Sequence, residues 1–98
     1  MEFNFKKVKK EPLRMVLPDG TALTLLPPKY KQLKKISAME GSLNDEQAIA
    51  LVADLLSDNL EKIQISAKQL TEQIDISDLS AFVETYMKYL QKITSQKN

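Results

Sequence analysis

The sequence predicts a mainly helical α+β protein, in which a small N-terminal β-hairpin is followed by about four helices. Two short β-rich runs, residues 13–17 and 21–26, flank Pro18-Asp19-Gly20, and apolar residues then recur at helical spacing. A chain of 98 residues has the length of one domain. We divide it into a basic arm or edge strand (1–10), the hairpin (13–26), a helical part (28–93) and a frayed tail (94–98).

The hairpin prediction rests on the turn residues. Proline presets φ at the first turn position, aspartate suits the second, and Gly20 takes a left-handed conformation that a side chain resists. A three-residue loop of this kind closes with a glycine bulge. Thr21, Leu23 and Leu25 then share one face of the second strand. Phe3 and Phe5 alternate in the same way, which is compatible with a third strand near residues 2–8.

Proline, glycine and capping residues predict where the first two helices begin and end. A short basic helix over residues 29–39 follows Pro27-Pro28, because proline ends a strand and fits the first turn of a helix. Gly41 closes this helix. Asn44 with Gln47 forms the capping-box pattern that opens the second helix.

Apolar stripes define the remaining helical part. The stripe of the second helix extends from Ile49 to Ile63. Ser66 with Gln69 predicts another capping box at the start of a short helix, and Ser77 is the predicted cap of the last helix. The stripe of the last helix consists of Leu79, Phe82, Val83, Tyr86, Leu90 and Ile93.

Four residues lie outside these stripes. Leu51 and Leu55 widen the apolar arc of the second helix, and Met87 and Tyr89 flank the stripe of the last one. A small domain cannot easily bury apolar residues on every side of two helices, and methionine and tyrosine are favoured at adaptable contact surfaces. We predict that at least two of the four are solvent-accessible and bind a partner; ordinary core packing is the competing interpretation.

Charge is divided unevenly along the chain. Residues 1–35 hold nine Lys or Arg against three acids, and residues 36–98 hold five against ten, for a net charge of +1. The N-terminal lysines Lys6, Lys7, Lys9 and Lys10 could make electrostatic contacts with phosphates or with an acidic protein surface, including that of a second copy. A solvated lysine face is the simpler interpretation. No helix-turn-helix or RNA-module pattern accompanies these lysines, so nucleic acid is not the favoured partner.

The sequence offers little for catalysis or metal binding. It contains neither histidine nor cysteine, which removes the usual nucleophile–base pairs and nitrogen or sulfur metal ligands. Asp54, Asp58 and Glu61 would share a helix face, but without a glycine-containing calcium loop a solvated face is favoured over a metal site. We therefore expect no enzyme activity, cofactor or metal.

Membrane insertion and secretion are not expected either. The longest apolar runs, "ALTLL" and "AIALVADLL", are far shorter than the ~20 residues that span a bilayer. The opening "MEFNFKKVKK" has no apolar segment after its charges, as a secretory signal would.

The order of the motifs resembles the tail assembly chaperones of long-tailed bacteriophages. In that family a "PDG" hairpin precedes a Pro/Tyr-led helix, an apolar helix and a final segment with spaced apolar residues. Here the corresponding stretches are "LPDGTALTL", "PPKYKQL", "DEQAIALVADLLSDNL" and "LTEQIDISDLSAFVETYM". The resemblance covers roughly residues 12–93, contains no catalytic or ligand-binding signature, and leaves out the lysine-rich start.

The resemblance implies a protein that binds the tape-measure protein and tail-tube subunits through apolar helix faces while a phage or prophage tail is built. It further implies self-association, a place in the cytoplasm of the bacterial host, and absence from the finished virion. The alternative is a small regulatory or nucleic-acid-binding protein that uses the basic N-terminal segment.

Overall fold

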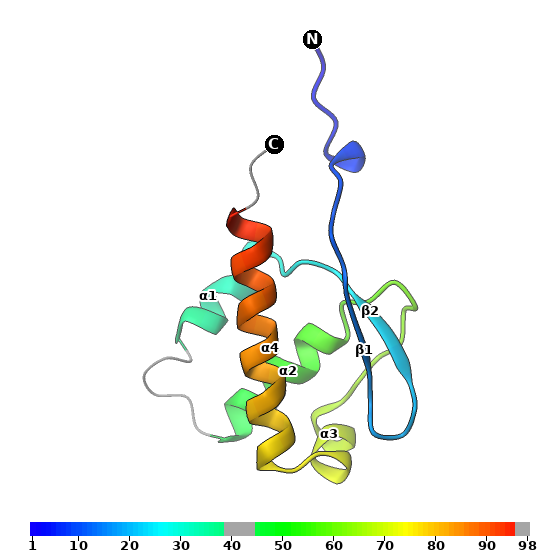
Figure 1. The fold of residues 1–98 in the computed structure, drawn as a ribbon, viewed down its shortest axis with the longest axis vertical. Helices are drawn as coiled ribbons and strands as arrows, with labels where there is room; N and C mark the ends of the chain where they lie inside the picture. Colours follow the sequence, from blue (N-terminus) through cyan, green and yellow to red (C-terminus); the bar gives the residue numbers. More distant parts are fainter. Residues whose placement is uncertain (39–44, 96–98) are drawn as a thin grey trace.

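The computed structural model describes residues 1–38 and 45–95, and the α+β prediction is confirmed: a two-stranded hairpin precedes four helices (Figure 1). The elements are, in chain order, the 3-10 turn η1 (Phe5–Lys7), strands β1 (Leu13–Val16) and β2 (Ala22–Leu25), and helices α1 (Tyr30–Ala38), α2 (Asp45–Leu56), α3 (Ala67–Gln73) and α4 (Ile76–Ser95).

The predicted hairpin turn is confirmed. Gly20 has a φ of +94°, its N–H donates to the Leu17 carbonyl at 2.8 Å, and the Leu17 N–H donates to the Thr21 carbonyl at 2.8 Å. The Asp19 carboxylate accepts the Thr21 N–H at 2.9 Å, and this local hydrogen bond stabilises the turn. The two strands pair in an antiparallel sense along their whole length.

Alternation along the strands places one face of the hairpin in the core. Leu23 and Leu25 are almost fully buried, whereas Ala22 between the turn and Leu23 is exposed. On β1 the outward positions are Arg14 and Val16. Leu23 and Leu25, which the period of two placed on the same face of the strand, are therefore both on the buried face.

The third strand near residues 2–8 is not formed. Phe5–Lys7 makes a 3-10 turn instead, in which the Asn4 side chain accepts the Lys6 N–H at 2.9 Å and the Asn4 carbonyl accepts the Lys7 N–H at 3.0 Å. These local bonds turn the chain and prevent a ladder with β1. Phe3 and Phe5 are both exposed in this arm, so their alternation in the sequence resembles a strand pattern although no strand is formed.

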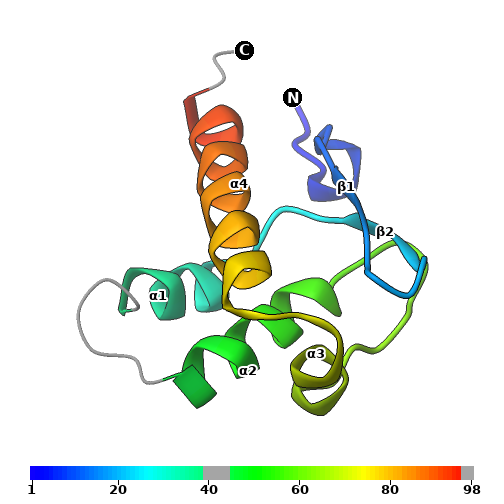
Figure 2. The same cartoon turned by 60° about the horizontal axis from the view of Figure 1, so that its bottom comes forward.

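Helix α2 is the centre of the fold. It packs against α1, α3 and β2, and α4 rises from the layer that these helices form (Figure 2). The buried residues of α2 are Leu51, Val52, Ala53, Leu55 and Leu56, and they meet Tyr86, Tyr89 and Leu90 of α4 in one apolar core. Neighbours on several sides explain why α2 is apolar around most of its circumference.

Helix α2 ends earlier than its apolar stripe predicted. The helix stops at Leu56, and Leu60 is 60% exposed in the segment that follows. Buried Asn59 donates to the Leu56 and Ile63 carbonyls at 2.7 and 2.8 Å and accepts the Ile63 N–H at 2.9 Å. The Asn59 side chain thus satisfies the backbone groups that a helix end leaves open, and the stripe beyond Leu56 is not helical.

The segment after α2 returns alongside β2. The Leu26 N–H donates to the Asp58 carbonyl and the Leu60 N–H donates to the Thr24 carbonyl, each at 3.0 Å. Leu25 also forms an isolated antiparallel bridge with Asn59.

One of the two later caps was predicted correctly. Ser66 and Gln69 form the expected capping box, with bonds of 2.9 and 3.1 Å. Ser77 is not the cap of α4, because the helix starts at Ile76 and Asp75 exchanges side-chain-to-backbone bonds with Asp78 at 2.9 and 3.0 Å. Aspartate in both positions performs the reciprocal capping that Ser/Thr and Glu/Gln usually perform. The predicted cap at Asn44 and helix end at Gly41 lie outside the described residues.

Candidate functional site

The prediction that at least two of the four off-stripe residues are solvent-accessible is wrong. Leu51, Leu55 and Tyr89 are 5%, 4% and 6% exposed, and only Met87 is half-buried. Leu51 and Leu55 are covered because helices lie on more than one side of α2. A helix wheel shows which residues share a face but not how many neighbours surround the helix.

Tyr89 is held in place at both ends of its side chain. Its ring packs edge-on against Tyr86 at 5.7 Å, and its hydroxyl donates to the Glu11 carbonyl at 2.6 Å. Lys92, almost one turn further along α4, forms an ion pair with the Glu11 carboxylate at 3.0 Å. Tyr89 and Lys92 therefore attach the root of the N-terminal arm to the last turns of α4.

An apolar groove opens where the turn end of the hairpin approaches α2, α3 and α4. It has a volume of about 280 Å³. Its lining residues are Met15, Val16, Leu17, Pro18, Val52, Leu56, Leu70, Ile74, Asp78, Ala81 and Phe82. We call this site the apolar groove.

The apolar groove has a buried floor and an accessible rim. Buried Val52, Leu56 and Leu70 form the floor, while Val16 on the rim is 67% exposed. Asp78 is the one charged residue among those that line the groove in the described part of the chain. A concave apolar surface with few polar groups is typical of a site that receives an apolar side chain.

Sequence reasoning missed the apolar groove because its parts come from four separate elements. One local signal was present: Val16 is apolar at an outward position of β1, directly before the turn. Phe82 was assigned to the core stripe, yet it is only half-buried and lines the groove.

The four N-terminal lysines are exposed, as a solvated face or an electrostatic contact would require: Lys6, Lys7, Lys9 and Lys10. They share the arm with Phe3 and Phe5, whose rings meet edge to face at 4.7 Å and are 69% and 79% exposed. The arm extends from the end of the hairpin opposite the turn, and in Figure 1 it points away from the helices along the long axis.

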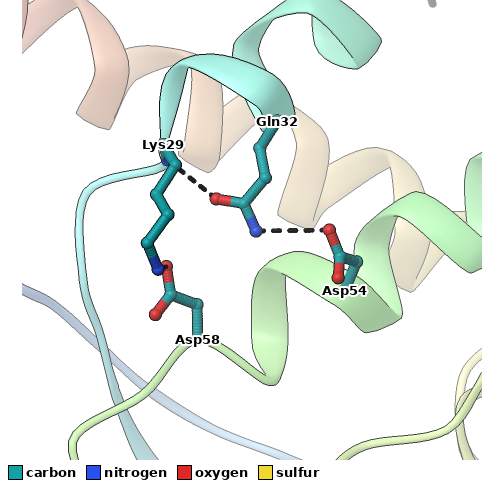
Figure 3. A network of polar contacts seen from close by, with 4 residues as sticks. All are labelled: Lys29, Gln32, Asp54 and Asp58. Carbon is teal, nitrogen blue, oxygen red and sulfur yellow. Dashed lines mark hydrogen bonds and ion pairs between the residues drawn. The ribbon is translucent and has the colours of Figure 1, made fainter.

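The acidic residues Asp54, Asp58 and Glu61 do not share a helix face, because α2 ends at Leu56. Asp54 accepts a bond from the Gln32 amide at 3.2 Å, and Gln32 in turn accepts the Lys29 N–H at 2.8 Å (Figure 3). Asp58 lies 3.8 Å from the Lys29 ammonium. These contacts join the start of α1 to α2 and to the segment after α2. The described residues contain no group of acidic side chains that could hold a metal ion.

The shifted pKa values have structural causes, which are hydrogen bonds for two carboxyl groups and burial for two phenols. The Thr24 hydroxyl and N–H, each 2.7 Å from the Glu61 carboxylate, hold the pKa of that carboxyl below its usual value. Bonds from the backbone and side chain of Thr21 likewise lower the pKa of Asp19. Burial raises the pKa of the Tyr86 and Tyr89 phenols.

Comparison of the chain with protein-family models, with curated proteins and with solved structures found no match in any of the three. Within the described part of the chain, no helix is both long enough and apolar enough to cross a membrane.

Proposed function

We propose that the chain is a tail assembly chaperone of a long-tailed phage or prophage, and that it receives an apolar helix face of the tape-measure protein in the apolar groove. The observation that carries the proposal is the groove, with its buried aliphatic floor and its exposed rim at Val16. The resemblance in the order of motifs over residues 12–93 supports the proposed family.

The shape and chemistry of the groove suit a helical client. An amphipathic helix binds a groove through apolar side chains spaced three or four residues apart. The groove volume of about 280 Å³ accommodates one or two such side chains. Each contact would be weak alone, so tight binding would come from many copies along one extended client. Tail-tube subunits would be met during the same assembly, in the host cytoplasm, and the chaperone would leave before the virion is complete.

The test is co-expression with the tape-measure protein, followed by affinity purification. Ala81 lies on the rim of the groove and is exposed, so Ala81→Arg should block the site without removing core atoms. We expect this substitution to reduce client recovery at least tenfold, because a charged side chain would replace apolar contact. Ser80→Arg is the matched control, since Ser80 is the exposed neighbour on the same helix and does not line the groove.

Client recovery that is equal for the Ala81→Arg variant and the Ser80→Arg control would contradict the groove as the binding site. Failure to recover any tape-measure protein with the wild-type chain would contradict the proposed function itself.

The exposed lysines favour one alternative, a regulatory protein that binds nucleic acid through its N-terminal arm. Four phosphate contacts would give a slope of about −3.6 in log K against log salt for duplex DNA. The chaperone proposal expects negligible binding to random duplex. Replacing Lys6, Lys7, Lys9 and Lys10 by glutamine would abolish DNA binding under the alternative and leave binding of the client largely unchanged under the proposal.

A further inference from the structure

Two apolar features at opposite ends of the molecule have no partner of matching shape among residues 1–38 and 45–95. At one end the aromatic pair of Phe3 and Phe5 is exposed on the N-terminal arm, and neither residue belongs to the core. At the other end the apolar groove opens beside the hairpin turn. In Figure 1 the arm and the turn end of the hairpin lie far apart along the long axis.

We propose that the arm of one copy inserts Phe3 and Phe5 into the apolar groove of a second copy, which joins the molecules head to tail. This inference deepens the proposed function, because it names the occupant of the same groove before a client arrives.

The volumes agree with this occupant. A cavity of about 150 Å³ accepts one benzene ring, so a groove of about 280 Å³ has room for nearly two. The two rings already meet edge to face at 4.7 Å, and they would enter as one preassembled unit.

The charges also match. Lys6 and Lys7 directly follow Phe5, and the charged residue that lines the groove is Asp78. Asp75 and Asp19 come from the adjoining cap of α4 and from the hairpin turn, and both are exposed. When the aromatic pair is seated, the lysines would therefore stand beside carboxylates at the rim.

The attachment of the arm explains why the groove is that of another copy. Tyr89 and Lys92 fix Glu11 on the last turns of α4, so the arm leaves the body at the end opposite the groove. Glu11 also precedes Pro12, and the residue before proline favours extended backbone over a reversal. The arm is thereby directed away from its own groove and towards a neighbour.

Such a contact is heterologous, because arm and groove are different surfaces. Each protomer then donates one arm and receives another, which gives a ring or an open chain rather than a symmetric pair. A client helix would compete with the arm for the groove, so client binding would disassemble these chains.

The test uses two full-length variants that each lack one half of the contact. Phe3→Ser/Phe5→Ser removes the aromatic pair, and Ala81→Arg blocks the groove; all three positions are exposed, and circular dichroism verifies each fold. Sedimentation between about 1 µM and 1 mM should show growing assemblies for the wild type and at least tenfold weaker association for each variant alone. Val16→Lys serves as a second groove variant if Ala81→Arg does not fold.

The decisive measurement is an equal mixture of the two variants. The first keeps its groove and the second keeps its arm, so one productive contact remains and the mixture should form a dimer that grows no further. Ser80→Arg should associate like the wild type. A wild type that stays monomeric throughout, or a mixture that stays monomeric when the wild type associates, would overturn the inference. No client is present in these measurements, so their failure is distinguishable from failure of the proposed function.

Discussion

Leu55→Lys distinguishes a core position from a surface position on α2. The side chain of Leu55 is 4% exposed and borders a gap of about 20 Å³ between α1, α2 and α4. The described residues that line this gap are apolar or aromatic, including Ile36 and Tyr86, and none of them is a carboxylate that could pair with an ammonium. We therefore expect Leu55→Lys to unfold the protein or to leave it only marginally stable.

The expected magnitude follows from two contributions. Losing a buried leucine side chain costs about 2–5 kcal/mol, and burying an unpaired ammonium costs several kcal/mol more. A domain of this size has about 5–15 kcal/mol of stability in total, so the two costs together are comparable to all of it.

Urea denaturation followed by circular dichroism measures the effect of Leu55→Lys. The matched control is Ala50→Lys, an exposed position on the same helix, which should change the free energy of unfolding by no more than about 0.5 kcal/mol. If Leu55→Lys were as stable as the control and weakened association, Leu55 would be a surface residue and the core described for α2 would be wrong.

Two further predictions concern the hairpin and the segment beside it. Gly20→Val should lower the free energy of unfolding by about 1 kcal/mol or more, whereas Gly20→Asn should lower it by less. A Cβ at Gly20 meets no atom within 4 Å, so the cost arises from the backbone conformation at φ +94°. Melting temperatures of both variants equal to that of the wild type would refute this prediction. The pKa of Glu61 is lowered by its bonds from Thr24, so the stability that Glu61 contributes is present above the unfolded-state pKa of about 4.5 and is lost as the pH falls through the folded-state value. Thermal melting of Glu61→Gln should therefore depend less on pH in this acidic range than melting of the wild type, and identical pH profiles would argue against the Thr24 contact.

The features that sequence predicted correctly are controlled by neighbouring residues. The turn at Pro18-Asp19-Gly20 depends on the dihedral preferences of its own residues, and the capping box of Ser66 with Gln69 closes within one helical turn. Such local patterns therefore predict the same local structure wherever the segment packs in the fold.

The features that sequence missed depend on distant parts of the chain. The apolar stripe continued to Ile63, yet the helix ends at Leu56. The buried Asn59 amide donates to the Leu56 carbonyl before it in the chain and to the Ile63 carbonyl after it, which stabilises this helix end. Leu51 and Leu55 lie outside the apolar stripe of α2, and their burial depends on how many other elements surround that helix. The apolar groove has four separate contributors, so periodicity within any one of them could not reveal it.

The return of residues 58–60 alongside β2 has a consequence for how copies of this protein can meet. An edge strand with unpaired N–H and C=O groups recruits strands from other molecules, which is a common origin of aggregation. On β2 the carbonyl of Thr24 and the N–H of Leu26 are already occupied by this segment, and Glu61 takes the Thr24 N–H. The outer edge of β1 is only four residues long and is flanked by Pro12 and Pro18, neither of which can donate a backbone hydrogen bond. The hairpin is thus poorly suited to grow by strand addition, which leaves contacts between side chains as the route by which one copy can recognise another.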